Sequence, residues 1–256
     1  MTKSFYDINF YNFEKIFCLK LIIDIGNTKT KIALFSEKKI ISKKIIEQCT
    51  FELVKEFVSD KEITSSIISS VKDLDQDILN ISNYYRSFLL NYNTPLPIKN
   101  LYKTPKTLGN DRIALVTAAN FLYNNKDVII IDAGTCITID FLNKNAEYLG
   151  GRISPGISMR FQSLNTFTDK LPLNKLEKST SFFGNDTDSA INSGVQRGVL
   201  SELDQIIYEY NELNPNVIVI LCGGDAFYLQ KELKSTIFVN QNLVLIGLNE
   251  ILDYNE

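Results

Sequence analysis

A pattern that occurs twice in this chain constrains its fold more than any other feature of the sequence. Each copy contains an apolar run, an Asp-x-Gly turn, a threonine and a second, alternating apolar stretch; the copies span residues 21–34 and 129–140. An apolar run, a tight turn and an alternating run predict a buried strand, a turn and a returning strand. Two copies at domain-sized spacing predict a duplicated fold in which one loop from each half faces a shared cleft.

The residues of the two turns are of the types that bind a phosphate group and its cation. Asp24 or Asp132 ends the first strand of each copy, a glycine allows close approach of the backbone, and a threonine hydroxyl follows. Carboxylate and hydroxyl oxygens suit a hard cation, and exposed backbone N–H groups suit phosphate. Each turn is therefore a candidate nucleotide-binding loop. A single Asp-x-Gly is common and more often structural, so the prediction depends on the repeat.

The absence of histidine limits the chemistry that the chain can perform. The 256 residues include no histidine, which excludes an imidazole base, a Ser-His-Asp triad and a His-ligated zinc. The four cysteines are scattered and form no Cys-x-x-Cys motif, so we expect them to pack as small apolar residues. Carboxylates, lysines and hydroxyls must carry any reaction.

Charge and hydropathy narrow the range of partners. The net charge is −3, and no cluster of Lys and Arg is interleaved with aromatic residues, so nucleic acid is not an expected partner. No apolar run approaches the roughly 20 residues of a membrane helix. Asp7, Glu14 and Lys20 interrupt the first 20 residues, so we expect no apolar core of a secretory signal there. We expect a soluble, cytoplasmic protein with no membrane contact.

Local patterns predict three segments along the chain: an N-terminal extension at 1–20, a first lobe at 21–108 and a second lobe at 109–256. Three of the six prolines lie in 91–109, which indicates a loop-rich bridge between the lobes. The predicted elements are strands at 30–35, 39–46, 65–71 and 217–222, helices at 51–58, 113–122 and 157–164, and a helix or strand at 243–248.

Asp111 and Arg112 lie where the helix after the bridge is expected to begin. An acid at a helix start is a good cap, and that is the structural interpretation of Asp111. An arginine is unfavourable there, so we expect Arg112 to meet an anion. The pair therefore favours a functional role.

Glycines at three further places can be read in two ways. The run Gly150–Gly156 is either a turn or a backbone that presents N–H groups to a ligand before a helix. Gly194 and Gly198 have the spacing of a close helix contact. The double glycine after residue 222 ends a buried strand in a shape that can receive a flat base.

Six motifs in order resemble the type III pantothenate kinases, which belong to the actin, heat-shock ATPase and sugar-kinase superfamily. They are D-I-G-N-T, G-N-D-R, D-A-G-T, G-G-R-I-S-P-G, G-N-D-T and C-G-G-D-A. The resemblance covers residues 21–248. It implies an α/β protein with the duplicated actin-like (ribonuclease H-like) ATPase fold, in which two lobes of mixed sheet flanked by helices meet at a cleft.

The resemblance also implies an activity: ATP- and Mg²⁺-dependent phosphorylation of pantothenate to 4'-phosphopantothenate, the first step of coenzyme A biosynthesis. It implies a monovalent cation, K⁺ or NH₄⁺, and a homodimer with the helix after Thr187 near the interface. Asp111 matches the catalytic base, Asp132 the monovalent-cation ligand and Asp24 a Mg²⁺ ligand. The matching ATP contacts are Asp24, Gly26, Asn27, Thr28, Lys31 and Thr135, and the matching pantothenate contacts are Tyr102, Gly109, Asn110, Asp111, Arg112 and Thr187.

Three positions depart from the family pattern: Thr104, Cys136 and Cys222 replace asparagine, alanine and threonine. None of them removes a group that phosphoryl transfer needs. Two alternatives remain open, a kinase for another small metabolite and a nucleotide-binding transcriptional accessory factor without turnover. Retention of both Asp24 and Asp111 favours an enzyme.

Overall fold

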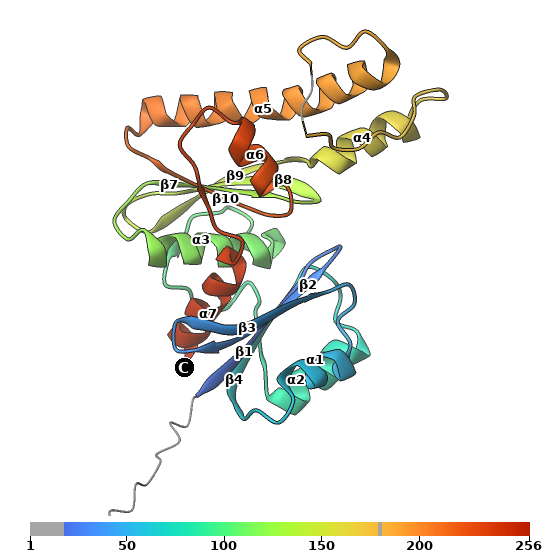
Figure 1. Cartoon of the computed structure of the whole chain (residues 1–256). Coiled ribbons are helices and arrows are strands. Elements are labelled where there is room, and N and C mark those ends of the chain that lie inside the picture. The colour runs from blue at the N-terminus through green and yellow to red at the C-terminus, as the bar shows by residue number, and fades with distance from the viewer. Residues whose placement is uncertain (1–17, 179–180) are drawn as a thin grey trace, which may run out of the picture.

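The computed structural model describes residues 18–178 and 181–256 as two sheets with helices between and around them (Figure 1). Residues 1–17, which include most of the predicted N-terminal extension, lie outside the described residues. The strands are β1 (Leu19–Ile25), β2 (Thr30–Ser36), β3 (Lys39–Ile46), β4 (Ile63–Ser70), β5 (Phe88–Leu89), β6 (Lys99–Asn100), β7 (Val128–Ala133), β8 (Cys136–Leu142), β9 (Glu147–Pro155), β10 (Ile218–Cys222) and β11 (Phe238–Val239). The helices are α1 (Phe51–Val58), α2 (Gln76–Tyr85), η1 (Pro105–Thr107), α3 (Asn110–Leu122), α4 (Ile157–Thr166), α5 (Thr187–Leu213), α6 (Ala226–Glu232) and α7 (Leu243–Asn255).

The two sheets repeat one topology. The first sheet has the order β3-β2-β1-β4-β5, and the second has the order β11-β10-β7-β8-β9-β6. In each, three consecutive strands form an antiparallel meander, and the first strand of that meander also pairs in parallel with a later strand, β1 with β4 and β7 with β10. The strand β6 is an addition at the edge of the second sheet. The predicted duplicated, actin-like fold with two mixed sheets is confirmed.

Three hydrophobic clusters divide the molecule into layers, which Figure 1 shows from the side. One cluster packs α1 and α2 against the outer face of the first sheet. A second packs α4, α5 and α6 against the outer face of the second sheet. The third lies between the sheets and includes residues of α3 and α7. Each sheet is therefore covered on both faces, which explains why its central strands are apolar almost throughout.

The helices α3 and α7 occupy corresponding places in the two repeats. Each follows the last strand of a five-stranded unit, and the two pack against each other between the sheets. The helix α7 also contacts β1, β2 and β4, although it ends the chain. The strand β6, which precedes residue 109, pairs with β9 of the second sheet. The division of the chain at residue 109 stays a prediction.

Most of the predicted elements are present in the structure, and two glycine patterns differ from expectation. Gly150 and Gly151 lie inside β9 rather than in a turn, at a bulge in its pairing with β8. Gly194 and Gly198 make no close helix contact, since no heavy atom of the described residues lies within 4 Å of a Cβ built on either. Residues 243–248 are helical. Within the described chain, no helix combines the length and apolarity needed to cross a membrane.

Candidate active site

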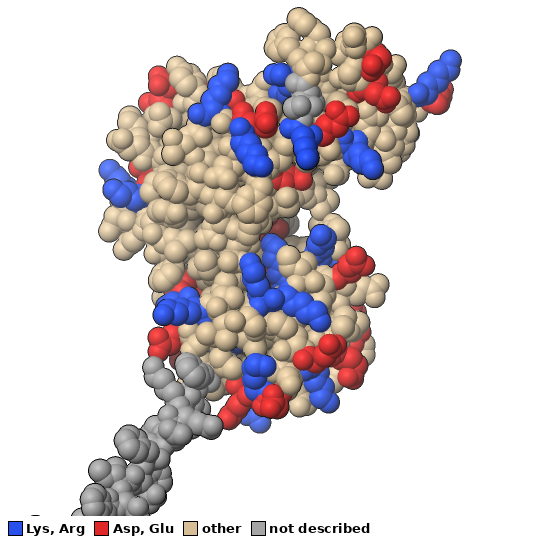
Figure 2. All heavy atoms as spheres, in the orientation of Figure 1, with Lys and Arg blue, Asp and Glu red and all other residues tan. Residues whose placement is uncertain are grey.

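The two Asp-x-Gly loops meet in space, as the repeat predicts. The Oγ1 atoms of Thr28 and Thr135, one from each loop, are 3.0 Å apart and share a hydrogen bond. Each loop joins two antiparallel strands of its own sheet, and a short backbone hydrogen bond closes it, from Gly26 N to Lys29 O or from Gly134 N to Cys136 O. Between the two halves the surface is hollowed into a cleft, and Lys and Arg side chains lie on one of its rims (Figure 2).

Asp24 is held at the centre of the first sheet. It pairs with Lys31 of β2 on one side and with Ser69 of β4 on the other. Directly opposite residues of neighbouring strands point to the same face of the sheet, so the lysine and serine flank the carboxylate. Ser69 donates a hydrogen bond from Oγ to Asp24 Oδ1 at 3.4 Å. Asp24 as a whole residue is only 6% exposed.

Asp132 has the corresponding place in the second sheet, between Thr138 of β8 and Cys222 of β10. Gly223 follows with φ +91°, and a Cβ there would lie 2.5 Å from Asp132 Oδ1 and press on the backbone of Ala133. A side chain at this position would therefore be strained and would crowd the carboxylate. Gly223 therefore packs closely against the second loop.

The carboxylates of the two loops repel each other across the cleft. Burial, together with the charges of Asp111 and Asp132, raises the pKa of Asp24 to about 6, although Lys31 and Ser69 work in the opposite direction. Burial and the charge of Asp111 likewise raise the pKa of Asp132 against the effect of Lys31. Several acids concentrated around one lysine form a site that an added cation would stabilise. The oxygen donors fit Mg²⁺ and phosphate-bound metal rather than a soft metal.

Protein side chains alone do not complete a metal-binding site. Within 18–178 and 181–256, no group of three or more His, Cys, Asp or Glu residues is arranged to hold a metal ion. Mg²⁺ commonly takes one or two carboxylates and fills its other positions with water and substrate phosphates. The residues present therefore fit a metal that arrives with a nucleotide.

The start of α3 brings Asp111 to the same cleft. Gly109 is the N-cap residue of α3 and makes no side-chain cap, while Asp111 Oδ1 accepts a hydrogen bond from Arg112 N at 2.8 Å. The Asn110 amide donates from Nδ2 to Ser70 O and Leu90 O at 3.3 and 3.1 Å, which ties α3 to the first sheet. Asp111 is therefore not the N-cap, and its charge acts on the loop carboxylates.

The place of Arg112 at a helix start predicts that it binds an anion. In the structure that anion is a carboxylate of the same chain. Arg112 donates from Nε and Nη2 to the carboxylate of Asp140 at 2.5 to 3.2 Å. Tyr148 also donates to Asp140 Oδ1 at 2.7 Å, and the Arg112 guanidinium lies 5.6 Å from the ring of Tyr102. Sequence analysis missed the roles of Asp140 and Tyr148. The sequence signal that could have indicated these roles is the acid Asp140 in a strand of alternating apolar residues.

Thr187 stands apart from this cluster within one chain. It is the first residue of α5, which is capped by Asp186 accepting from Ser189 N at 2.8 Å. Thr187 lines a groove of about 630 Å³ between α4 and α5, along with apolar residues such as Leu164 and Ile191. Asp24, Asp111 and Asp132 do not line that groove.

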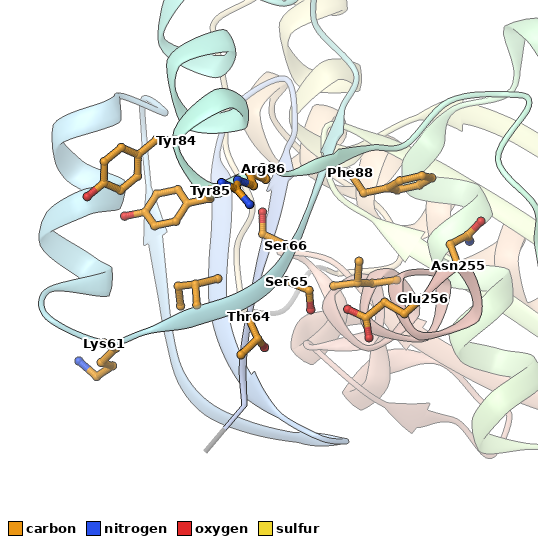
Figure 3. Close-up of a pocket in the computed structure, with 12 residues that line it drawn as sticks. Lys61, Thr64, Ser65, Ser66, Tyr84, Tyr85, Arg86, Phe88, Asn255 and Glu256 are labelled. Atoms are coloured by element: carbon orange, nitrogen blue, oxygen red, sulfur yellow. The ribbon is translucent and has the colours of Figure 1, made fainter. Parts of the chain in front are cut away.

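Another groove, of about 610 Å³, lies at the edge of the first sheet (Figure 3). It exists because β5 pairs with only two residues of β4, which leaves the start of β4 without a neighbour on that side. Tyr85 and Arg86 from the end of α2 line one side, and Asn255 and Glu256 from the chain end line the other. None of the cleft acids lines it, so we do not connect it with the cleft.

Solved structures with a similar fold include proteins described as sugar kinases and one described as a transcriptional activator. One described as a Baf family transcriptional activator, from Campylobacter jejuni, aligns with 92% of this chain and 98% of its own at a TM-score of 0.61 and 22% identity. Lmo2764 from Listeria monocytogenes, described as an N-acetylmannosamine kinase, aligns with 93% of this chain and all of its own at a TM-score of 0.55 and 13% identity. At these identities the likeness supports the fold alone.

Sequence relatives identify the family. The model of the type III pantothenate kinase family matches residues 20–209. The type III pantothenate kinase of Phocaeicola vulgatus is 41% identical over 240 residues, which are 93% of this chain and 99% of that protein. That of Christiangramia forsetii is 43% identical over 244 residues, again 93% of this chain and 99% of its own. The chain therefore belongs to the type III pantothenate kinase family.

Proposed function

We propose that the cleft transfers a phosphoryl group from ATP to the primary hydroxyl of pantothenate, with the two Asp-x-Gly loops on the nucleotide and the start of α3 on the acceptor. The contact between Thr28 and Thr135 carries this proposal, because it brings one loop of each repeat to a single place. Phosphoryl transfer requires neutralisation of charge and an acceptor held in line, rather than a covalent intermediate. Neither charge neutralisation nor alignment of the acceptor needs an imidazole, so a site without histidine is sufficient.

The roles of the individual residues follow from their charge and position. ATP with Mg²⁺ would supply the phosphoryl group and neutralise its charge, and Asp24 is the carboxylate placed to meet the metal. Gly26, Asn27, Thr28 and Thr135 offer loop hydroxyls and backbone groups to the phosphates, and Lys31 adds a positive charge. Asp111 orients the acceptor hydroxyl and takes its proton late in the reaction.

We expect activity to depend on a monovalent cation at Asp132. Thr138, directly opposite on β8, has a buried Oγ1 with no hydrogen-bond partner among the described residues. A carboxylate and an unpaired hydroxyl suit a hard cation. Replacing K⁺ by tetramethylammonium at constant ionic strength should slow turnover several-fold, and Asp132→Asn should abolish the difference. Equal initial rates of the unaltered enzyme in both salts would contradict the assignment.

We also expect a homodimer that uses the groove between α4 and α5. Its walls are largely apolar, Gly194 has open space in front of it, and Phe167, Phe182 and Phe183 are exposed nearby in the chain. Sedimentation equilibrium should give twice the chain mass of 29.1 kDa. Gly194→Lys should yield monomers with a raised KM for pantothenate, whereas Gln205→Lys, on the exposed part of α5, should remain dimeric. A monomeric mass of the unaltered chain at all concentrations would contradict the dimer.

A direct test of the proposed reaction is a coupled assay for ADP release. ADP should appear with ATP and pantothenate together, and a panel of other small alcohols should give little. Turnover of a different acceptor would instead favour the alternative kinase. Binding of ATP without turnover of any acceptor would favour a nucleotide-binding regulator; the Campylobacter jejuni protein of similar fold is described as a transcriptional activator.

A further inference from the structure

Asp140 is a fully buried acid beside the cleft, with an exposed fraction of 0%. It lies on β8, two residues beyond Thr138, and so faces the same side of the second sheet as Thr138 and Asp132. An ionised carboxylate at such a depth must be paired and hydrogen-bonded. Its partners therefore indicate what it does.

Three donors converge on Asp140. Arg112 donates from Nε at 3.0 Å and from Nη2 at 2.5 Å to Oδ1, and Tyr148 donates its hydroxyl to the same oxygen at 2.7 Å. Arg112 is itself only 4% exposed. Burial works against its cation, but the hydrogen bonds and charge of Asp140 outweigh burial and raise the pKa of the guanidinium. Arg112 is thus a fixed, permanent cation.

The backbone opposite Asp140 is shaped to leave room for this pair. Gly151 of β9 is its cross-strand neighbour, and a Cβ there would lie 2.7 Å from Asp140 Oδ1. A side chain at this position would collide first with the backbone carbonyl of Ile139 on β8 and then with the carboxylate that holds Arg112. These two close approaches are the reason why a glycine occurs within the strand.

The ion pair with Asp140 uses one edge of the guanidinium. Nε and Nη2 donate to Asp140, Nη1 lies outside this ion pair, and Tyr102 is the neighbouring side chain that also interacts with the guanidinium. The Tyr102 ring lies over the guanidinium at 5.6 Å and stacks on Tyr148 with the ring planes 7° apart. The next residue along α3 toward its start is Asp111, whose Oδ1 accepts from Arg112 N.

We propose that Asp140 is a positioning residue, which holds the Arg112 guanidinium so that its remaining edge receives the carboxylate of the acceptor substrate. This proposal rests on the proposed function, because it assumes that the acceptor is pantothenate. Arginine binds carboxylates through a planar fork, and such binding depends on the orientation of the plane. Asp140 fixes the orientation of the guanidinium plane through its hydrogen bonds to Nε and Nη2, and the ring of Tyr102 limits tilting of that plane.

The test compares two acceptors that differ only in the carboxylate: pantothenate and its primary amide. Asp140→Asn should reduce the ratio of kcat/KM for pantothenate to kcat/KM for the amide by roughly tenfold or more, the range of a charge-assisted hydrogen bond. KM for ATP should stay within about twofold, since the side-chain hydrogen bonds of Asp140 go to Arg112 and Tyr148 and not to either loop. Arg112→Lys should reduce the ratio similarly, mainly through KM for pantothenate. A purely structural role for Asp140 would lower both acceptors equally, and an unchanged or increased ratio would overturn the proposal.

Asp140→Asn leaves a buried arginine without its counter-ion, which can unfold the chain. Tyr148→Phe then decides the question, because it removes one hydrogen bond to Asp140 and keeps the ion pair; it should reduce the same ratio by about threefold. An unchanged ratio in Tyr148→Phe, with normal folding, would overturn the proposal as well. Glu147→Gln is the matched control, since it breaks a neighbouring ion pair with Lys99 without touching Arg112. If the unaltered enzyme phosphorylates neither acceptor, the proposed function itself fails.

Discussion

Replacing Asp111 with asparagine is expected to lower kcat by at least about a hundredfold, because removal of a general base typically reduces the rate by roughly 10² to 10⁴. The asparagine keeps the Oδ1 that accepts from Arg112 N, so the start of α3 should remain intact. It does not take the proton from the acceptor hydroxyl. Steady-state kinetics with ATP and pantothenate measures kcat, and thermal melting checks the fold.

A purely structural role of Asp111 at the start of α3 makes a different prediction. Asparagine keeps the side-chain oxygen that accepts from Arg112 N, so a structural role would lose neither stability nor turnover. Asp75→Asn is the matched control, because Asp75 is the N-cap of α2 and accepts from Ile78 N at 2.9 Å outside the cleft. It should leave kcat unchanged. Near-normal turnover of Asp111→Asn would leave the mechanism without its base.

The sequence predicts the two loops well because their signal is local and occurs twice. An apolar strand, an Asp-x-Gly turn and a returning strand are decided by neighbouring residues, and each copy folds as expected. The meeting of the loops was inferred from repetition, and Thr28 and Thr135 confirm it. What could be predicted is therefore the pair of hairpins that carries the candidate site.

The role of Asp140 could not be predicted, because it depends on a contact between segments 28 residues apart. Alternation along β8 places Thr138 and Asp140 on one face and Ile137 and Ile139 on the other. In a sheet with one face in solvent, the polar side would face water. Here helices cover both faces, so the polar side is buried against α3. The place of Gly151 within β9 could not be predicted either, since the need for glycine there comes from the Ile139 backbone and the Asp140 side chain across the strand pair.

Asp24→Asn is expected to have opposite effects on activity and on stability. Loss of the carboxylate proposed to meet the metal should reduce kcat by at least about a hundredfold, the effect of removing one electrostatic contact to a developing charge. Yet the ligand-free protein should become more stable. Its folded state holds Asp24 near Asp111 and Asp132 in a buried place, with the pKa of Asp24 at about 6 against an ordinary value of 3.8.

The pH dependence of this gain follows from the direction of the shift. Because the folded-state pKa is the higher one, the folded protein binds the proton more tightly, and stability falls as pH rises between 3.8 and about 6. Above that window the ionised carboxylate lowers the free energy of unfolding by about 3 kcal/mol, at roughly 1.4 kcal/mol per pKa unit. Asparagine carries no charge, so Asp24→Asn does not have this loss in the free energy of unfolding. In a chelator without nucleotide, Asp24→Asn should melt about 6 °C or more above the unaltered chain at pH 8, and the difference should vanish near pH 4.

Lys31→Met is the matched variant of opposite sign. Lys31 lies opposite Asp24 and favours its ionised form, so its removal should lower stability at pH 8 rather than raise it. The pair of variants separates electrostatic repulsion from a general tolerance of substitution in the cleft. If Asp24→Asn melts at a lower temperature than the unaltered chain at pH 8, the charge of Asp24 stabilises the fold. The carboxylates of the cleft then do not repel one another in the way that a bound metal and nucleotide would relieve.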